Sequence, residues 1–169
     1  MRSILKVNWD SNLPIYKISQ SELQKKGINS LLLDVDGTLV NRKSNMIPKT
    51  VKNWIIESKK LFSLYLISNN PSKTRIAKIA KELNLKYKYN ASKPRKKLTL
   101  YAIKEIGKEP KNIAIIGDRI FTDIIVGNRC HIKTILVKRL NRDGLPIKFN
   151  LTLTIEKLIS HFIKWKLGL

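Results

Sequence analysis

The sequence predicts an α/β fold in which helices cover a mainly parallel β-sheet. Short apolar runs alternate along the chain with longer segments of helical periodicity, a pattern typical of consecutive βαβ units. Carboxylate, glycine and hydroxyl residues directly follow several of the apolar runs, as ligand-binding residues do at the carboxyl ends of parallel strands. Together these two observations predict one sheet covered on both faces, with a functional site at one of its edges.

The apolar runs that we expect to form strands are Leu31–Val35, Phe62–Ile67, Leu85–Tyr89, Asn112–Ile116 and Lys133–Val137. The segments that we expect to form helices are Ser19–Gly27, Pro48–Lys60, Pro71–Leu83, Arg95–Ile106, Ile120–Asn128 and Leu153–Leu167. Proline is well tolerated in the first turn of a helix, so Pro48 and Pro71 support two of the helix starts. Gly107 supports the end of another helix, because glycine commonly follows the last helical residue. The segment Asn141–Asn150 is the best candidate for a loop.

A chain of 169 residues with 43% hydrophobic residues predicts one domain with a real core. We expect this single domain to span residues 1–169, with its core at about 28–140 and a C-terminal amphipathic helix at about 153–167. The one cysteine, Cys130, excludes an internal disulfide bond, fits a reducing compartment and is expected to be buried. No secretion signal is visible after Met1, and the apolar runs are too short to span a bilayer. We therefore expect a cytoplasmic protein.

The balance of charge is strongly basic, with 34 Lys and Arg against 12 Asp and Glu and a net charge of +22. Such a surface attracts polyanions, including nucleic acid, anionic lipid headgroups and phosphorylated substrates. A biased genome composition would produce the same charge by scattering lysines over solvated surfaces. The local cluster that stands out is Lys93-Pro94-Arg95-Lys96-Lys97. Composition alone leaves both explanations open.

The motif Asp34-Val35-Asp36-Gly37-Thr38 directly follows the apolar run Ser30–Leu33. Gly37 lets the chain leave the strand, so Asp34 and Asp36 both gather at the carboxyl end of that strand. Two carboxylates at one such edge are unfavourable unless a cation compensates them, and carboxylate oxygens suit Mg²⁺. Solvated aspartates at a capped strand end are the alternative. The motif therefore predicts a site for a divalent metal.

Three further motifs follow later strands. The hydroxyl and the free backbone N–H groups of Ser68-Asn69-Asn70 suit a phosphate, although helix capping is the common alternative. Lys93 is placed to neutralise a phosphate, although any single lysine in so basic a chain is by default a surface residue. Gly117-Asp118 brings a third carboxylate to the edge, and Asp123 follows it, where a carboxylate in the first turn of a helix is the alternative.

In this order, and each at the end of an apolar strand, the motifs resemble those of the haloacid dehalogenase (HAD) superfamily of phosphohydrolases over roughly residues 28–137. Segments 68–70, 91–94, 117–123 and 127–129 are similar to subfamily IIIA, the branch of the YqeG-like phosphatases and the phosphatidylglycerophosphatases. One position departs from that branch, because Gly37 stands where its members often have asparagine. The resemblance implies a Rossmann-like three-layer sandwich of the HAD type and Mg²⁺-dependent hydrolysis of a phosphate monoester.

The resemblance implies catalytic and phosphate-binding roles for the matching residues. Asp34 would be the nucleophile that forms an aspartyl phosphate. Asp36 would act first as the general acid and then as the general base. The phosphate would be held by Ser68, by the backbone N–H of Asn69 and by Lys93.

The same resemblance implies a metal site with three aspartates. Mg²⁺ would be bound by Asp34, by the backbone carbonyl of Asp36 and by Asp118. Asp123 would support the metal through water or would orient Lys93. The remaining motif residues that we expect to support the site are Gly37, Thr38 and Gly117.

The spacing of the motifs bears on the substrate. Neither the interval Asp36–Pro48 nor the interval Ser68–Lys93 has room for a cap domain, so we expect an open active site suited to a phosphate on a large molecule. The resemblance, the missing cap and the charge favour phosphatidylglycerophosphate, with peripheral contact to the anionic cytoplasmic face of the membrane. Phosphorylated nucleic-acid ends are the second choice, and their binding would weaken steeply with salt. A non-catalytic RNA- or ribosome-associated module is a third reading, disfavoured because its carboxylates would repel phosphate.

The C-terminal segment carries apolar residues at helical spacing: Ile155, Leu158, Ile159, Phe162 and Ile163. A basic amphipathic helix of this kind, with Trp165 near its end, lies either in a membrane interface or against the core of its own domain. We favour packing on the sheet, because most amphipathic helices cover a core. His131 and His161 have no metal-ligand partners nearby in the sequence and are expected to be structural.

Overall fold

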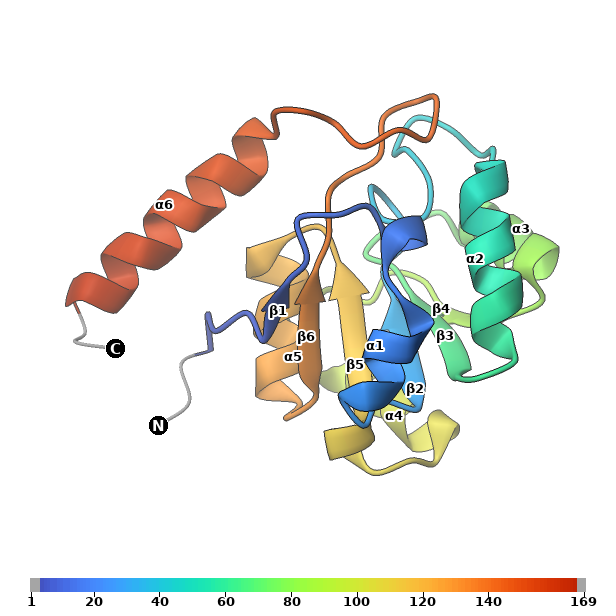
Figure 1. Ribbon diagram of the computed structural model, residues 1–169, viewed down its shortest axis with the longest axis horizontal. Coiled ribbons are helices and arrows are strands. Elements are labelled where there is room, and N and C mark those ends of the chain that lie inside the picture. The colour runs from blue at the N-terminus through green and yellow to red at the C-terminus, as the bar shows by residue number, and fades with distance from the viewer. Residues whose placement is uncertain (1–3, 167–169) are drawn as a thin grey trace.

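The computed structural model describes residues 4–166 and shows a three-layer α/β sandwich (Figure 1). Its six-stranded sheet has the order β1-β6-β5-β2-β3-β4, and every pair of neighbouring strands is parallel. The strands are β1 (Trp9–Asp10), β2 (Ser30–Leu33), β3 (Ser63–Ile67), β4 (Lys86–Lys88), β5 (Ile113–Gly117) and β6 (Lys133–Leu136). The predicted α/β fold with a parallel sheet is confirmed. Because all of these strands run in one direction, their carboxyl ends share one edge.

Alternation of apolar side chains along the central strands builds two cores, one on each face of the sheet. Leu31 and Leu33 of β2 belong to one core, whereas Leu32 belongs to the other. The first core is covered by α1 (Gln20–Lys25), α2 (Lys49–Lys59) and α3 (Lys73–Leu83). The second core is covered by α4 (Lys97–Ile106) and α5 (Ile125–Arg129). Strands buried on both faces read as continuous apolar runs, which is why the sequence revealed them.

Two features of the fold were not visible in the sequence. Strand β1 pairs with β6 at the sheet edge, and it is too short to show a period of its own. The Asn8 side chain ties this segment down, because its Oδ1 accepts a hydrogen bond from the backbone N–H of Thr134 at 2.9 Å. In place of one helix over 120–128, the chain forms a π-helical turn η3 (Ile120–Ile124) and then α5. Such turns recur at functional sites, and η3 carries Asp123.

The remaining segments are η1 (Ile15–Lys17), η2 (Pro110–Asn112) and α6 (Leu151–Lys166). Segment 141–150 forms no helix or strand, as expected of a loop. Cys130 is buried and free, as predicted. Among the described residues, the intervals from Asp36 to α2 and from Ser68 to Lys93 hold only a loop and the α3–β4 unit, so no cap domain is inserted there.

The expectation that α6 packs its apolar side chains on the sheet is wrong for four of the five apolar residues that suggested it, while Ile163 packs in the cluster that contains Leu136 of β6. The predicted last residue, Leu167, lies outside the described residues. The helix lies beside the sandwich (Figure 1) and packs against η3. The face it turns to the domain includes Leu153, Glu156, Ser160 and Ile163, while Ile155, Leu158, Ile159 and Phe162 are exposed. No helix within residues 4–166 is long and apolar enough to cross a membrane.

Candidate active site

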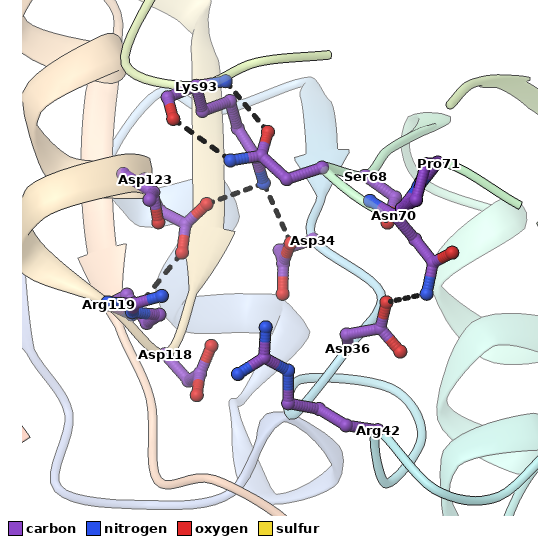
Figure 2. Close-up of a pocket in the computed structure, with 12 residues that line it drawn as sticks. Asp34, Asp36, Arg42, Ser68, Asn70, Pro71, Lys93, Asp118, Arg119 and Asp123 are labelled. Atoms are coloured by element: carbon purple, nitrogen blue, oxygen red, sulfur yellow. Dashed lines mark hydrogen bonds and ion pairs between the residues drawn. The ribbon is translucent and has the colours of Figure 1, made fainter. Parts of the chain in front are cut away.

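A pocket of about 170 Å³ lies at the shared carboxyl edge of the strands (Figure 2). Its walls come from the segments that follow β2, β3, β4 and β5. The residues that line it are Asp34, Asp36, Arg42, Ser68, Asn69, Asn70, Pro71, Lys93, Asp118, Arg119, Thr122 and Asp123. The fold therefore brings together every polar motif residue whose side chain was expected to reach a phosphate or a metal.

Asp34 lies at the centre of the pocket, and both of its carboxylate oxygens have partners. Oδ1 accepts a hydrogen bond from Lys93 Nζ at 2.7 Å, and Oδ2 accepts one from the hydroxyl of Thr38 at 3.0 Å. Thr38 is itself buried. These two contacts hold the carboxylate in one orientation, as a nucleophile requires.

Asp36 lies on the opposite wall and is bound to a different set of groups. Its Oδ1 forms an ion pair with Arg75 Nη1 at 2.6 Å, and its Oδ2 accepts a hydrogen bond from Asn70 Nδ2 at 2.9 Å. Figure 2 shows the side chain of Asp36 apart from the central Asp34 and turned toward Asn70. The two aspartates of one motif therefore have different environments, which suits two different roles.

Lys93 is the buried cation of the site. Its Nζ donates hydrogen bonds to Asp34 Oδ1 at 2.7 Å, to Asp123 Oδ1 at 2.6 Å and to the carbonyl of Ile67 at 3.0 Å. Burial disfavours the charged form, but the charges of Asp123 and Asp34 outweigh this and raise the pKa of Lys93 above its usual value. Lys93 therefore stays charged beside the carboxylates, and the surface-lysine alternative does not apply to it.

Ser68 and Asn69 connect β3 to the segment that carries Lys93. The side chain of Asn69 joins the two segments with two hydrogen bonds. Its Oδ1 accepts one from the Lys93 N–H at 2.7 Å, and its Nδ2 donates one to the Lys93 carbonyl at 2.9 Å. Ser68 is buried at the pocket wall, and its hydroxyl accepts a hydrogen bond from the Asn70 N–H at 3.1 Å. The cap of α3 is Ser72, not Ser68 or Asn70. The Asn69 side chain thus positions Lys93.

The environment of the Asp118 carboxylate indicates that a cation fits this site. Its Oδ1 is buried and has no hydrogen-bond partner in the described part of the chain, while Oδ2 is bound by Arg139 Nε at 2.5 Å. Oxygen atoms of Asp34, Asp118 and Asp123 lie within 4.8 Å of one another. Buried carboxylates this close repel one another, and oxygen-rich clusters of this kind suit hard divalent cations.

The pKa values of these carboxylates reflect the same crowding. Burial, followed by the charges of Asp34 and Asp123, raises the pKa of Asp118 to about 7, although Arg139 opposes the rise. Burial also raises the pKa of Asp123 to about 6, with Lys93 opposing and Asp34 adding to it. A bound divalent cation would oppose these rises, because its charge favours the ionised carboxylates.

Two motif glycines leave room for these carboxylates. A Cβ on Gly37, whose φ is +98°, would lie 2.7 Å from Asp118 Oδ2. A Cβ on Gly117 would lie 2.3 Å from Asp123 Cγ. Real Cβ atoms do not approach other atoms so closely, so a larger residue at either position would displace an aspartate of the cluster.

Sequence reasoning missed the arginines that contact the aspartates. Arg75 lies in the first turn of α3, and Arg139 follows β6 at the same edge of the sheet. Arg139 could have been found from the sequence, because it follows a predicted parallel strand. No sequence signal marked Arg75, because its partner Asp36 is 39 residues away. Arg42 and Arg119 also line the pocket, and Figure 2 shows Arg42 reaching into it from the segment after β2.

Comparisons with known proteins agree with this architecture. Residues 90–143 match the family model described as HAD-hydrolase-like. The chain is 28% identical over 154 residues to "Probable phosphatase YqeG" of Bacillus subtilis (strain 168), a match that covers 90% of this chain and 88% of that protein.

Solved structures share the fold. An uncharacterized protein from Listeria monocytogenes serotype 4b has a TM-score of 0.55 at 17% identity, covering 75% of this chain and 86% of that one. The HAD-hydrolase YfnB from Bacillus subtilis, bound to magnesium, has a TM-score of 0.53 at 14% identity, covering 71% and 90%. The motifs, the family model over residues 90–143 and the YqeG relative all point to HAD-like hydrolases, and the chain is homologous to YqeG over most of its length.

Proposed function

We propose that the chain is a Mg²⁺-dependent phosphomonoester hydrolase that works through an aspartyl phosphate on Asp34, and that its substrate is phosphatidylglycerophosphate. The observation that carries the reaction is the buried cluster in which Lys93 joins Asp34 to Asp123 beside the half-paired Asp118. The phosphatase name of the YqeG relative supports the same reaction.

The residues that would hold Mg²⁺ are Asp34, Asp118 and the backbone carbonyl of Asp36, with Asp123 supporting them. The orphaned Oδ1 of Asp118 and the crowding of three carboxylates support this assignment. The carboxylate of Asp36 is bound by Arg75 and Asn70 and lies outside the carboxylate cluster, which leaves only its backbone for a metal. Magnesium in the structure of YfnB agrees with this choice of cation. When bound, Mg²⁺ would offset negative charge on the phosphate and on the carboxylates.

The first half of the reaction breaks the ester bond. A carboxylate oxygen of Asp34 forms a bond to phosphorus while the bond from phosphorus to the leaving oxygen breaks. Asp36 in its protonated form gives its proton to that oxygen, which leaves as an alcohol. Lys93, already fixed beside Asp34, offsets the charge that gathers where the two anions meet. Ser68, at the same wall, is placed to bind a phosphate oxygen.

The second half returns the enzyme to its starting state. Asp36, now a carboxylate, takes a proton from water, and the oxygen of that water attacks phosphorus while the bond to Asp34 breaks. Inorganic phosphate leaves, and Asp36 holds the proton it will donate in the next cycle. The hydrogen bonds from Arg75 and Asn70 hold the Asp36 side chain in one place at the pocket wall through both halves of the reaction.

The lipid substrate is supported by the shape and charge around the pocket. No cap domain covers the described site, so a phosphate presented on a large assembly can reach it. Arg42 adds positive charge to the pocket wall, which suits a substrate with a second phosphate near the first, whereas the charge of Arg119 is paired with Glu156. A small metabolite would gain little from such an open site.

The test is phosphate release by the purified full chain from phosphatidylglycerophosphate in micelles, with Mg²⁺ or with EDTA. A small aryl phosphate and a 5′-phosphorylated oligonucleotide serve as comparison substrates. Release from the lipid at a rate at least about tenfold above both comparison substrates, and lost in EDTA, is the expected result. Faster release from the oligonucleotide would replace the lipid by nucleic-acid ends, and no release from any of the three would overturn the phosphatase proposal.

The raised pKa values predict how stability changes with pH. An aspartate has a pKa of about 3.8 when unfolded, so between pH 4 and 7 the native Asp118 and Asp123 hold protons that the unfolded chain has lost. The free energy of unfolding of the metal-free protein should therefore fall by roughly 4–6 kcal/mol as the pH rises through this window. Saturating Mg²⁺ displaces those protons, so the stabilisation by Mg²⁺ should be larger at pH 8 than at pH 5. Urea unfolding at both pH values, with EDTA or Mg²⁺, measures this; equal stabilisation at both would contradict it.

A further inference from the structure

The outer face of α6 is an exposed apolar surface that the active site does not use. This outer face consists of large apolar residues that are 41–74% exposed: Leu151, Ile155, Leu158, Ile159, Phe162 and Trp165. They recur at intervals of three and four residues, so they form one stripe along the helix. A stripe of this length in water is unfavourable, and exposed apolar patches of this kind mark interaction sites.

The contacts that attach α6 to the domain keep this apolar stripe exposed. Glu156 is buried on the inner side, where its carboxylate accepts hydrogen bonds from the Ile120 N–H at 2.7 Å and from Arg119 Nε at 3.0 Å. Leu153 and Ile163 pack near the same η3 segment. A buried, charge-paired glutamate fixes which side of the helix faces the domain, because breaking such a pair is strongly unfavourable. The apolar stripe is therefore directed outward.

The charges around α6 indicate an anionic partner. Glu156 is the acidic residue of the helix, and it is buried and paired with Arg119, so the outer face presents no carboxylate. Lys138 and Lys148 line a pocket between the start of α6 and the domain, together with Lys157, which is paired with Asp10 at 2.8 Å. A second copy of this chain would bring another +22 charges to the face, whereas an anionic surface would be attracted by them.

We propose that the outer face of α6 docks on a lipid bilayer that contains anionic phospholipid. A 16-residue helix with one apolar stripe, basic surroundings and a tryptophan in its last turn has the features of a helix that lies in the membrane interface. The apolar side chains enter the boundary between headgroups and acyl chains, and the lysines contact lipid phosphates. The helix then lies parallel to the membrane surface.

Docking in this way also places the active site near the membrane. Arg119 lines the catalytic pocket and is bound to Glu156 of α6, so the pocket wall and the docking helix form one hydrogen-bonded unit. The first turn of α6 lies toward the end of the molecule to which the strands point (Figure 1). That the bilayer also presents the substrate rests on the proposed function; the docking surface itself does not.

The experiment is flotation of the full-length protein with vesicles of phosphatidylcholine alone or of phosphatidylcholine mixed with phosphatidylglycerol. The wild type should float with the mixed vesicles at least about tenfold more strongly than with phosphatidylcholine, and more weakly at high salt. Leu158→Gln/Phe162→Gln should reduce this binding by at least about tenfold. The matched control is Thr154→Ser/His161→Gln, two exposed polar positions of the same helix, and it should bind as the wild type does.

Trp165 provides a second readout, because it is exposed in the lipid-free protein. Its fluorescence should shift to the blue with mixed vesicles, and Trp165→Phe should remove this shift. Absence of wild-type binding, or equal binding by Leu158→Gln/Phe162→Gln, would overturn the proposal. A lipid-free dimer that this double variant converts to a monomer would identify the face as a contact between copies instead. Asp34→Asn should float as the wild type does, which separates failure of docking from failure of the proposed catalysis.

Discussion

Asp34→Asn should lower the rate of phosphate release by roughly 10⁴-fold or more, the largest effect that we expect from any single substitution. The amide of asparagine is not a nucleophile, so no bond to phosphorus forms. The loss should not come from unfolding, because Lys93 keeps its contacts with Asp123 and with the carbonyl of Ile67. Removing the Asp34 charge also reduces the repulsion among three close, buried carboxylates. The measurement is single-turnover phosphate release with Mg²⁺, alongside thermal unfolding of both proteins.

A covalent readout separates the nucleophile from a merely structural carboxylate. Acid quenching of the wild type during turnover of labelled substrate should leave phosphate covalently attached to the protein, and Asp34→Asn should carry none. Asp143→Asn, in the exposed 141–145 turn, is the matched control and should retain both activity and labelling. Label of wild-type amount on Asp34→Asn would mean that another residue forms the bond to phosphorus.

Lys93→Met should destabilise the metal-free protein by about 3–5 kcal/mol at pH 8, because it leaves buried carboxylates without their cation. Lys93 is 4% exposed and is bound to both Asp34 and Asp123, so water cannot replace the lost contacts. The loss should be smaller at pH 5, where Asp118 and Asp123, with pKa values of about 7 and 6, are protonated. Urea unfolding in EDTA at the two pH values gives both numbers.

Two companion variants make this result specific. Lys104→Met removes an exposed lysine of α4 and should change stability by less than about 0.5 kcal/mol. Lys93→Met/Asp123→Asn removes one negative charge together with the positive one, so it should recover part of the lost stability. A loss that is the same at pH 5 and pH 8 and that the second substitution does not reduce would point to poor packing of methionine rather than to uncompensated charge.

The convergence of the motifs was predictable from the sequence for a simple physical reason. Strands buried on both faces leave continuous apolar runs, and the carboxyl ends of parallel strands share one edge. Residues that follow such runs, including Asp34, Ser68 and Asp118, must therefore lie together, and the structure places them around one pocket. Their chemical roles were predicted from the resemblance to HAD phosphohydrolases, because position alone does not assign a role.

Contacts between distant residues were decided only by the tertiary structure. The sequence does not show that Arg75 would bind Asp36 or that Arg139 would bind Asp118, because local periodicity carries no information about such pairs. The π-helical turn is of the same kind, since the five residues of η3 are too few to show a period of their own.

The C-terminal helix shows most clearly which features the sequence determined and which the tertiary structure decided. Its apolar stripe was determined by the sequence alone, because spacing along a helix is a local property. Which side would face the domain was decided by Glu156, whose pairing with Arg119 and the Ile120 N–H holds its own side of the helix inward. Burial of a charged group is settled by partners that are distant in the chain, so only the tertiary structure could show that the apolar stripe of α6 faces outward.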